Sequence, residues 1–90
     1  MEIEFSANFR KRYLKANVRV RNRVNELLKI FKNNPNDPQL NNHKLTKEWE
    51  RHRSIDVTSD WRAIYKEVLI DEDIISNFVD IGTHQELYGK

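Results

Sequence analysis

The stretch WRAIYKEVLIDEDIISNFVDIG, residues 61–82, decides the fold of this 90-residue chain. Residues 61–70 and 74–82 are rich in β-branched and aromatic side chains, which favour extended strands. The intervening residues 71–73, DED, are typical of a tight turn. Two such strands joined by a tight turn predict an antiparallel hairpin.

Shorter segments on both sides extend this hairpin into a sheet. The segment RSIDV (53–57) alternates its side chains, which places Ile55 on one face and Asp56 on the other. The turn TSD (58–60) connects that segment to the hairpin. The segment EIEF (2–5) alternates in the same way and predicts a short, half-buried strand near the N-terminus.

Two helices are expected between the first strand and the others. Ser6 is a suitable N-cap for a helix over about residues 7–15, and Asn17 for a second helix. The segment NNPNDP (33–38) ends the second helix, because each proline disfavours helical backbone in the residue before it. The second helix carries one apolar stripe with helical spacing: Val20, Val24, Leu27, Leu28 and Phe31.

The helical hairpin is the only segment available to cover the apolar face of the sheet. We therefore predict a single α+β domain over residues 1–90 with the order β-α-α-β-β-β. No cysteine is present, which excludes disulfides and thiolate metal sites. The three histidines lack the spacing of a metal-binding motif, so we expect neither a metal nor another cofactor. No run of about 18 apolar residues and no signal peptide is visible, so we expect no membrane association and a cytoplasmic location.

Charge is divided unevenly along the chain. Residues 1–53 hold thirteen Lys and Arg and six Asp and Glu, a net charge of +7, whereas residues 54–90 have a net charge of −5. Residues 10–23 contain seven basic side chains and no acidic one. Such a surface attracts polyanions or acidic partners, although it also suits a solvated helix face.

Two segments together resemble a known family: HKLTKEWERHRSIDVTSDWRAIYKEV (43–68) and IGTHQELY (81–88). In this order, His-x-Leu, a Trp, Arg-Ser, Asp-Trp-Arg-x-Ile-Tyr and Gly-Thr-His-x-x-Leu-Tyr resemble the RelE/ParE superfamily of type II toxin–antitoxin toxins. The YafQ-like ribonuclease branch is the most similar. The resemblance implies a RelE-like fold and a ribosome-dependent mRNA endonuclease that is silenced by a cognate antitoxin.

The resemblance also implies a reaction. The RNA's own 2′-hydroxyl attacks the phosphate without a metal, and the products carry a 2′,3′-cyclic phosphate and a 5′-hydroxyl. This chemistry requires a base, an acid and a cation or hydrogen-bond donor for the charged phosphorane. On the protein side, the partners implied are the antitoxin, the 70S ribosome and mRNA.

Several residues match the positions that carry function in the family. His84 is the expected proton carrier, because histidine exchanges protons near neutral pH. Tyr88 either stacks on an RNA base or anchors the C-terminus. Arg62 either grips the scissile phosphate or forms a cross-strand ion pair. His43 is a loop histidine that is either catalytic or merely exposed.

The Asp-Trp pair at the turn has two interpretations. Asp60 is a candidate general base, although a carboxylate is a weak base at neutral pH, and it is equally suited to an Asx turn. Trp61 is a wall of an RNA cleft or a packing residue. The remaining expected RNA contacts are the basic side chains of the helical hairpin, on which rRNA would lie: Arg10, Lys11, Lys15 and Arg19.

Three positions depart from the YafQ-like pattern. Asp56 replaces a histidine, and Lys47 and Arg51 replace glycines. A carboxylate about 5 Å from a phosphate repels it by about 3 kcal/mol at an effective dielectric near 20. Asp56 is therefore the general base itself, or a partner of Arg62 or His43, or a residue that lowers activity.

Nearby residues are given structural interpretations. Strand alternation places Arg53 on the Ile55 side, away from the expected site. His52 lies on the Asp56 side and is a secondary candidate. Trp49 and Tyr65 are expected to pack in the core or at the sheet edge.

Two other functions remain open. A ParE-like toxin on the same fold would bind DNA gyrase without catalysis, but that branch generally lacks the terminal His-x-x-Leu-Tyr. A catalytically silent protein that only binds an antitoxin is the third hypothesis, and it depends on Asp56 and the two missing glycines.

Overall fold

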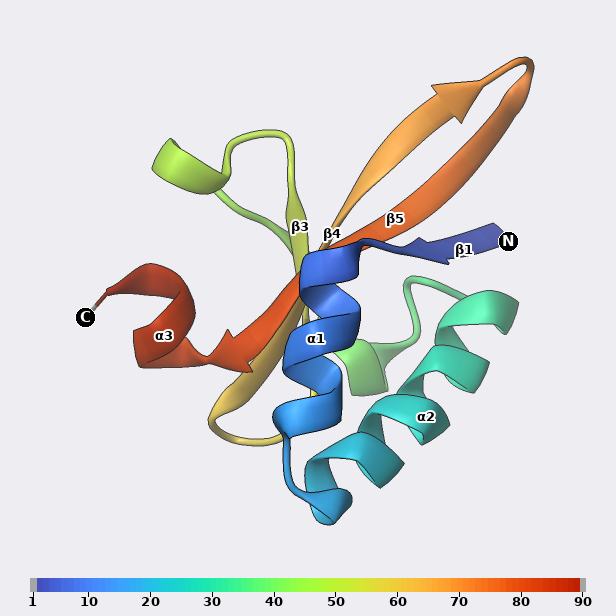
Figure 1. Cartoon of the computed structure of the whole chain (residues 1–90). Helices are drawn as coiled ribbons and strands as arrows, with labels where there is room; N and C mark the ends of the chain where they lie inside the picture. Colours follow the sequence, from blue (N-terminus) through green and yellow to red (C-terminus); the bar gives the residue numbers. More distant parts are fainter. Residues whose placement is uncertain (1, 90) are drawn as a thin grey trace.

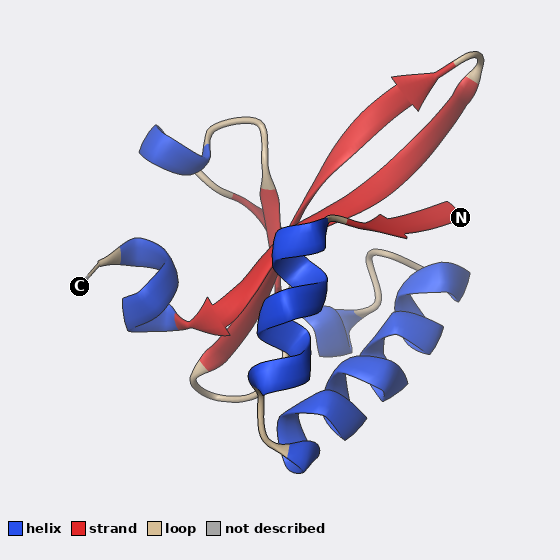
Figure 2. Cartoon of the chain, viewed as in Figure 1, coloured by secondary structure: helices blue, strands red, loops and turns tan. Residues whose placement is uncertain are grey.

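The computed structural model describes residues 2–89. A twisted five-stranded sheet forms the centre of the molecule, with two helices packed on one face and a short helix at the C-terminal end (Figures 1 and 2). The strands are β1 (Glu2–Phe5), β2 (His43–Lys44), β3 (Arg53–Asp56), β4 (Trp61–Ile70) and β5 (Asp73–Thr83). The helices are α1 (Ala7–Lys15), α2 (Val18–Asn33) and α3 (His84–Tyr88), with 3₁₀ turns η1 (Pro38–Leu40) and η2 (Lys47–Trp49).

The sheet has the order β1-β5-β4-β3-β2. Strand β1 runs parallel to β5, and every other neighbouring pair is antiparallel. The first strand after the helices, β2, runs opposite to β1. The three antiparallel pairings from β2 to β5 reverse the direction three times, so β5 runs parallel to β1. The predicted α+β class and the antiparallel β3-β4-β5 meander are confirmed.

The predicted caps form at both long helices. The Oγ atom of Ser6 accepts a hydrogen bond from the backbone N–H of Phe9 (3.0 Å). The Oδ1 atom of Asn17 accepts one from the N–H of Val20 (3.0 Å). Each bond satisfies one of the free N–H groups of a first helical turn.

An aromatic cluster joins α2 to the sheet. The ring centroid of Phe31 lies 5.0 Å from that of Tyr65 and 5.2 Å from that of Phe78, with edge-on geometry in both pairs. Four members of the predicted stripe are buried, whereas Leu28 is only partly buried. The apolar face of α2 therefore packs on the sheet as the periodicity predicted.

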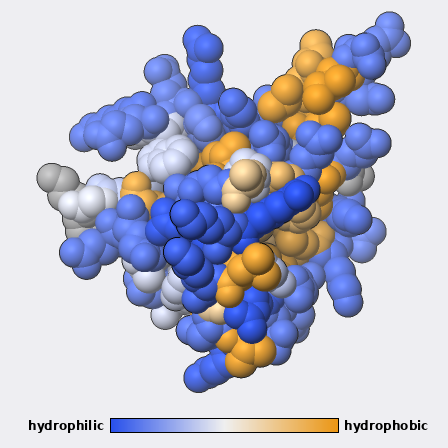
Figure 3. All heavy atoms as spheres, viewed as in Figure 1, coloured by the Kyte–Doolittle hydropathy of each residue, from blue (hydrophilic) through white to orange (hydrophobic). Residues whose placement is uncertain are grey.

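The far half of the β4–β5 hairpin projects from the body of the molecule (Figure 1). Its apolar side chains Leu69, Ile70 and Ile74 are exposed, and hydrophobic atoms gather on this projection in Figure 3. None of the described helices has the length and apolar composition needed to cross a bilayer.

Three features of the fold were not predicted. The strand expected over residues 53–57 ends at Asp56, because the N–H of Val57 turns to the carbonyl of Trp61 (2.9 Å). His43, which was expected in a loop, lies in the short strand β2, and the two 3₁₀ turns flank this strand. Residues 84–88 form helix α3, so His84, which directly follows the end of β5 as expected, is also the first residue of a helix.

Candidate active site

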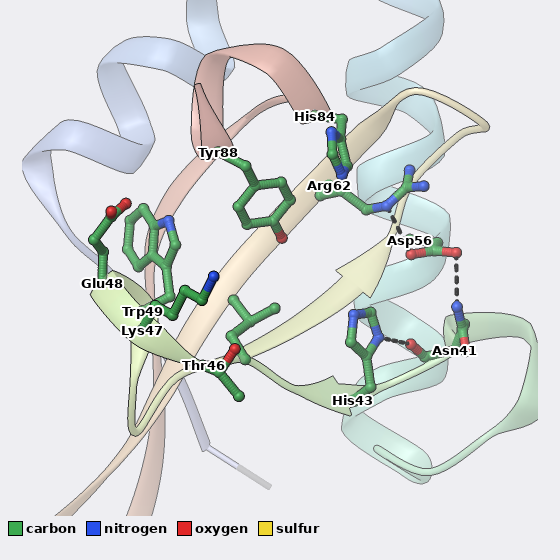
Figure 4. A pocket seen from close by; sticks show the side chains of 11 residues that line it. Asn41, His43, Thr46, Lys47, Glu48, Trp49, Asp56, Arg62, His84 and Tyr88 are labelled. Atoms are coloured by element: carbon green, nitrogen blue, oxygen red, sulfur yellow. Dashed lines mark hydrogen bonds and ion pairs between the residues drawn. The ribbon is translucent and has the colours of Figure 1, made fainter. Parts of the chain in front are cut away.

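A pocket of about 690 Å³ opens where β3, β4, α3 and the segment 41–49 meet, and we call it the cleft (Figure 4). Arg62 and Asp56 line it, whereas their sequence neighbours Ala63 and Ile55 are buried in the main core. Because side chains alternate along a strand, the cleft and the helical core lie on opposite faces of the sheet. The cleft is lined by Asn41, His43, Leu45, Thr46, Lys47, Glu48, Trp49, Asp56, Arg62, His84 and Tyr88.

Arg62 and Asp56 form an ion pair across β3 and β4. The Nε atom of Arg62 lies 2.9 Å from Oδ1 of Asp56, and the two residues are opposite one another in the strand register. The guanidinium also donates to the carbonyl oxygens of Thr58 (2.8 Å), Trp61 (3.0 Å) and Ser59 (3.3 Å). Arg62 therefore holds the β3–β4 turn in place, and few of its donors remain for a ligand.

Asp56 is held from its other side by Asn41. The Nδ2 atom of Asn41 donates to Oδ2 of Asp56 (3.0 Å). Asn41 has a φ of 45°, a left-handed conformation that asparagine tolerates better than most residues. Oδ2 of Asp56 therefore accepts a hydrogen bond, whereas the buried Oδ1 has the ion-pair contact with Arg62 but accepts no hydrogen bond from residues 2–89. Of the sequence-based options, the pairing with Arg62 is the one observed.

His43 lies on β2 with one ring nitrogen fixed. Its Nδ1 atom is 2.8 Å from the carbonyl oxygen of Asn41, as drawn in Figure 4. A carbonyl oxygen can only accept, so Nδ1 carries the hydrogen. The other nitrogen, Nε2, is then the one that can accept or donate a proton in the cleft.

His84 and Tyr88 lie on the same side of α3. They are four residues apart, which places their side chains one above the other on a helix. Their ring centroids are 4.6 Å apart with an interplanar angle of 67°, and both line the cleft. The hydroxyl of Tyr88 reaches Ser54 Oγ at 3.5 Å, so α3 is tied to the sheet beneath it.

A capping box fixes the start of α3. The Oγ1 atom of Thr83 accepts from the N–H of Glu86 (3.2 Å), and Oε1 of Glu86 accepts from the N–H of Thr83 (2.8 Å). The backbone N–H of Thr83 lowers the pKa of the Glu86 carboxyl, and the Thr83 hydroxyl and Arg12 act in the same direction. This box orients the first residue of the helix, His84, because it sets the backbone that carries the imidazole.

Trp49 connects the segment 41–49 to α3. Its Nε1 donates to the carbonyl oxygen of Leu87 (3.1 Å), and its ring meets that of His52 edge-on at 5.3 Å. Trp49 is half-buried and lines the cleft, so it is both a packing residue and a wall. Thus the two sides of the cleft, η2 and α3, are joined by one indole hydrogen bond.

Outside the helical hairpin, three sequence-based site candidates do not line the cleft. Asp60 is exposed in the β3–β4 turn, where its carbonyl oxygen accepts from the N–H of His84 (2.9 Å). Trp61 packs against the main core on the opposite face of the sheet from Arg62. His52 faces Trp49, and its Nδ1 contacts the carbonyl oxygen of Glu50 (3.0 Å).

Arg53 and Tyr65 have the structural roles that the sequence indicated. The Nε atom of Arg53 donates to Oδ1 of Asn42 (2.7 Å), and Nδ2 of Asn42 donates to the hydroxyl of Tyr65 (2.7 Å). Burial raises the pKa of the Tyr65 hydroxyl, against the opposing effects of Asn42 and Arg53. This chain of bonds lies on the core side of the sheet.

The basic side chains of the helical hairpin form two groups: some bind acidic or carbonyl groups of the protein, and others are exposed to solvent. Arg12 pairs with Asp80 (3.1 Å) and Glu86 (3.5 Å), and Arg21 donates to the carbonyl oxygen of Ala16 at the end of α1. These two side chains are partly used in holding the fold. The four basic residues expected to contact RNA are exposed and do not line the cleft: Arg10, Lys11, Lys15 and Arg19.

Comparison with known proteins identifies the family. The family model for the bacterial toxin YafQ of type II toxin–antitoxin systems matches residues 1–89. The chain belongs to this family. It is similar to the crystal structure of YafQ from E. coli strain BL21(DE3), with 32% identity, 98% of each chain covered and a TM-score of 0.78.

Two further solved structures place this YafQ-family toxin among its relatives. YafQ in the E. coli DinJ–YafQ complex is 29% identical over 98% of both chains, with a TM-score of 0.71. The YoeB/ParE toxin from Agrobacterium tumefaciens is 15% identical over 93% of this chain and 99% of its own, with a TM-score of 0.75, and shares the fold. No curated protein matches the chain.

The cleft of this family member includes residues that sequence reasoning missed. Asn41 was not singled out, although the Asn-Asn pair before His43 is typical of left-handed turn positions. Lys47 was noted only as a lost glycine, and it lines the cleft. Within residues 2–89, no three His, Asp or Glu side chains cluster closely enough to hold a metal ion.

Proposed function

We propose that this YafQ-family toxin is a ribosome-dependent endoribonuclease that cuts mRNA with two imidazoles as acid and base. One observation carries the proposal: His84 and His43 come from segments 41 residues apart in sequence and line the same cleft. Tyr88, Arg62 and Lys47 line it with them. RNA cleavage through the 2′-hydroxyl requires a base, an acid and a cation, and two imidazoles with neighbouring cations can supply them.

His43 is assigned the role of general base. Its Nδ1–H is occupied by the carbonyl oxygen of Asn41, so Nε2 of the neutral ring is the proton acceptor. In the proposed step, Nε2 removes the proton of the 2′-hydroxyl, and the 2′-oxygen bonds to phosphorus. Asp60 and Asp56 are less suited to this role, because Asp60 lies outside the cleft and the carboxylate of Asp56 is ion-paired with Arg62 and accepts a hydrogen bond from Asn41.

His84 is assigned the role of general acid. The bond from phosphorus to the 5′-oxygen breaks as His84 protonates that oxygen, which leaves a 2′,3′-cyclic phosphate and a 5′-hydroxyl. The exposed position of His84 at the first turn of α3 suits transfer to a large substrate. The edge contact with Tyr88 holds the imidazole, and the exposed part of the Tyr88 ring is available for base stacking.

Positive charge for the phosphorane comes from two side chains. Arg62 lies beside the cleft but shares its charge with Asp56, which reduces its pull on a phosphate. Lys47 is exposed in the cleft and has no ion-pair partner among residues 2–89. We therefore assign the larger share of phosphate attraction to Lys47.

The ribosome and an antitoxin are the proposed partners. The exposed cations of α1 and of the start of α2 are suited to rRNA, whose phosphates attract such a surface. An acidic segment of a cognate antitoxin would cover the same cations, and the E. coli DinJ–YafQ complex supports such a partner. Action on ribosomes would place the toxin in the cytoplasm.

The test is cleavage of mRNA on purified 70S ribosomes, with mapping of both product ends. We expect 2′,3′-cyclic phosphate and 5′-hydroxyl ends, which are the products of attack by the 2′-hydroxyl. The Asp56→Asn variant separates the roles of that carboxylate: it keeps the side-chain shape and removes the charge, so cleavage should persist or rise.

Two results would contradict the proposal. A loss of cleavage of about a hundredfold or more in Asp56→Asn would make Asp56 the base. Inhibition of DNA supercoiling by gyrase, with no mRNA cleavage on ribosomes, would favour the ParE-like function instead.

A further inference from the structure

The loop 46–52 contains two residues in a strained backbone conformation. Lys47 has a φ of 57° and Arg51 a φ of 70°. This left-handed region crowds the Cβ atom against the backbone, and glycine avoids the conflict. Both side chains are exposed, and neither has an ion-pair partner within residues 2–89. Contacts inside the protein therefore do not explain why lysine and arginine occupy these positions.

The loop is rigid enough to hold these conformations. The N–H of Leu45 donates to the carbonyl of His52 (3.0 Å), which closes the loop at its base. Within the loop, the N–H of Glu50 donates to the carbonyl of Lys47 (3.0 Å). The Trp49 indole then fastens the loop to the helix that carries His84. The two cations are thus presented from a fixed backbone, at fixed places relative to the cleft.

The loop separates two hollows that share Lys47. On one side is the cleft, and on the other is a second hollow of about 400 Å³. Basic residues outnumber acidic ones in the second hollow, where the acidic residues are Glu50 and Glu67. Its basic residues are Lys44, Lys47, Arg51, His52 and Arg53.

We propose that Lys47 and Arg51 form a phosphate-binding ridge over which the RNA backbone passes from the cleft into the second hollow. This inference rests on the proposed nuclease function and adds a binding track to it. Single-stranded RNA is favoured over an acidic peptide because Trp49 lies between the two cations in sequence and lines the cleft. Cations interleaved with an aromatic ring are typical of single-strand binding.

The ridge also offsets the negative charge of the acidic residues that line the cleft. Asp56 and Glu48 add negative charge where a phosphate must enter. Lys47 offsets this charge at the rim, and Arg51 extends the positive surface beyond it. The unfavourable backbone conformation is then the cost of placing two cations where glycine would supply none.

The double variant Lys47→Gly/Arg51→Gly gives the sharpest test, because the inference predicts opposite changes in stability and binding. Relief of two left-handed residues should raise Tm by several degrees. Affinity for a short, uncleavable 2′-O-methyl oligoribonucleotide should fall roughly tenfold, and the slope of log K against log salt should decrease by about 1.4 for two lost phosphate contacts. Fluorescence anisotropy at several salt concentrations measures both quantities.

Three control variants separate the effect of backbone strain on Tm from the effect of charge on RNA affinity. Asp71→Gly relieves a residue with a φ of 56° in the distant β4–β5 turn, so Tm should rise without a change in RNA affinity. Lys29→Ala removes an exposed cation from α2 and should also leave oligonucleotide binding unchanged. Lys47→Arg/Arg51→Lys keeps both charges and should bind as the wild type does.

Two outcomes overturn the ridge: equal RNA affinity in the double variant despite a raised Tm, or unchanged RNA affinity with weakened antitoxin binding. The second outcome would assign the cations to a peptide. A wild-type toxin that binds the oligonucleotide through these residues but cuts no ribosome-bound mRNA would refute the nuclease and leave the ridge standing.

Discussion

The two faces of the sheet are built in different ways. On the helical face, the rings of Phe31, Tyr65 and Phe78 pack at centroid distances of 5.0–5.2 Å within one apolar cluster. On the cleft face, Ser54 and Ile64 are fully buried cross-strand neighbours, but they lie outside that cluster. The walls of the cleft come from separate segments that are joined by individual polar contacts.

The difference indicates how stability and function are divided. Burial of apolar area on the helical face supplies most of the driving force for folding. A single hydrogen bond on the cleft face contributes on the order of 1 kcal/mol. We therefore expect the cleft face to tolerate substitutions that change activity, and the helical face to tolerate few.

The largest expected effect is on the helical face. Phe31→Ala leaves a cavity among Tyr65, Phe78 and the other core residues, so it should lower the free energy of unfolding by about 3–5 kcal/mol. Urea denaturation followed by tryptophan fluorescence measures the change, with Leu28→Ala as a control at a partly buried site of the same helix. A loss under about 1 kcal/mol would show that the aromatic cluster does not dominate stability.

Arg62→Ala should have an intermediate effect. It removes three hydrogen bonds to the β3–β4 turn and leaves Asp56 without its cation, which should lower the free energy of unfolding by about 1–3 kcal/mol. Cleavage should fall as well, because the turn carries the carbonyl of Asp60 that contacts His84. Unchanged stability with lost cleavage would instead indicate that the Arg62 guanidinium binds RNA and does not stabilise the turn.

Gly82→Ala tests the contact between the two faces. A Cβ atom there would lie 2.8 Å from Nη2 of Arg12, so the guanidinium must move away from Asp80 and Glu86. Because that guanidinium ends a flexible side chain, we expect a loss of only about 0.5–1 kcal/mol. Thermal unfolding measures it, and a loss above about 2 kcal/mol would mean that the backbone shifts as well.

The smallest expected effect is a pH dependence of the stability of α3. The lowered pKa of Glu86 means that its contribution to stability is complete above the ordinary carboxyl range and is lost as the pH falls through the folded-state value. Glu86→Gln keeps a hydrogen-bond acceptor for Thr83 and should flatten this dependence. Hydrogen exchange at the amide of Thr83, which donates to the Glu86 carboxylate, would reveal this dependence between about pH 3 and pH 6. Identical profiles for both proteins would contradict the assignment.

Local signals in the sequence predicted the helical face well. Ser6 and Asn17 cap their helices by side-chain bonds within one turn, and the stripe on α2 follows a fixed helical period. The hairpin of residues 61–82 was predicted equally well, because strand-favouring residues flank a segment that is typical of a tight turn. Such signals depend on neighbours in sequence, so no tertiary contact was needed to interpret them.

The cleft was harder to predict because its contacts are long-range. Asp60 and His43 were both candidates, and only the turn geometry shows that His43 enters the cleft while the Asp60 carboxylate does not. Helix α3 is five residues long, too short for periodicity, although the spacing of Thr83 and Glu86 matches a capping box. The left-handed backbone at Lys47 contradicts local propensity and could not be inferred from residue type.

One measurement tests the central claim that an imidazole on α3 performs the chemistry. His84→Ala and Gln85→Ala change neighbouring exposed residues of the same short helix, but of the two only His84 lines the cleft. The account predicts that mRNA cleavage on ribosomes falls by about 10²–10⁴-fold in His84→Ala and stays at the wild-type rate in Gln85→Ala, with matching Tm values. Cleavage by His84→Ala at the wild-type rate would contradict it.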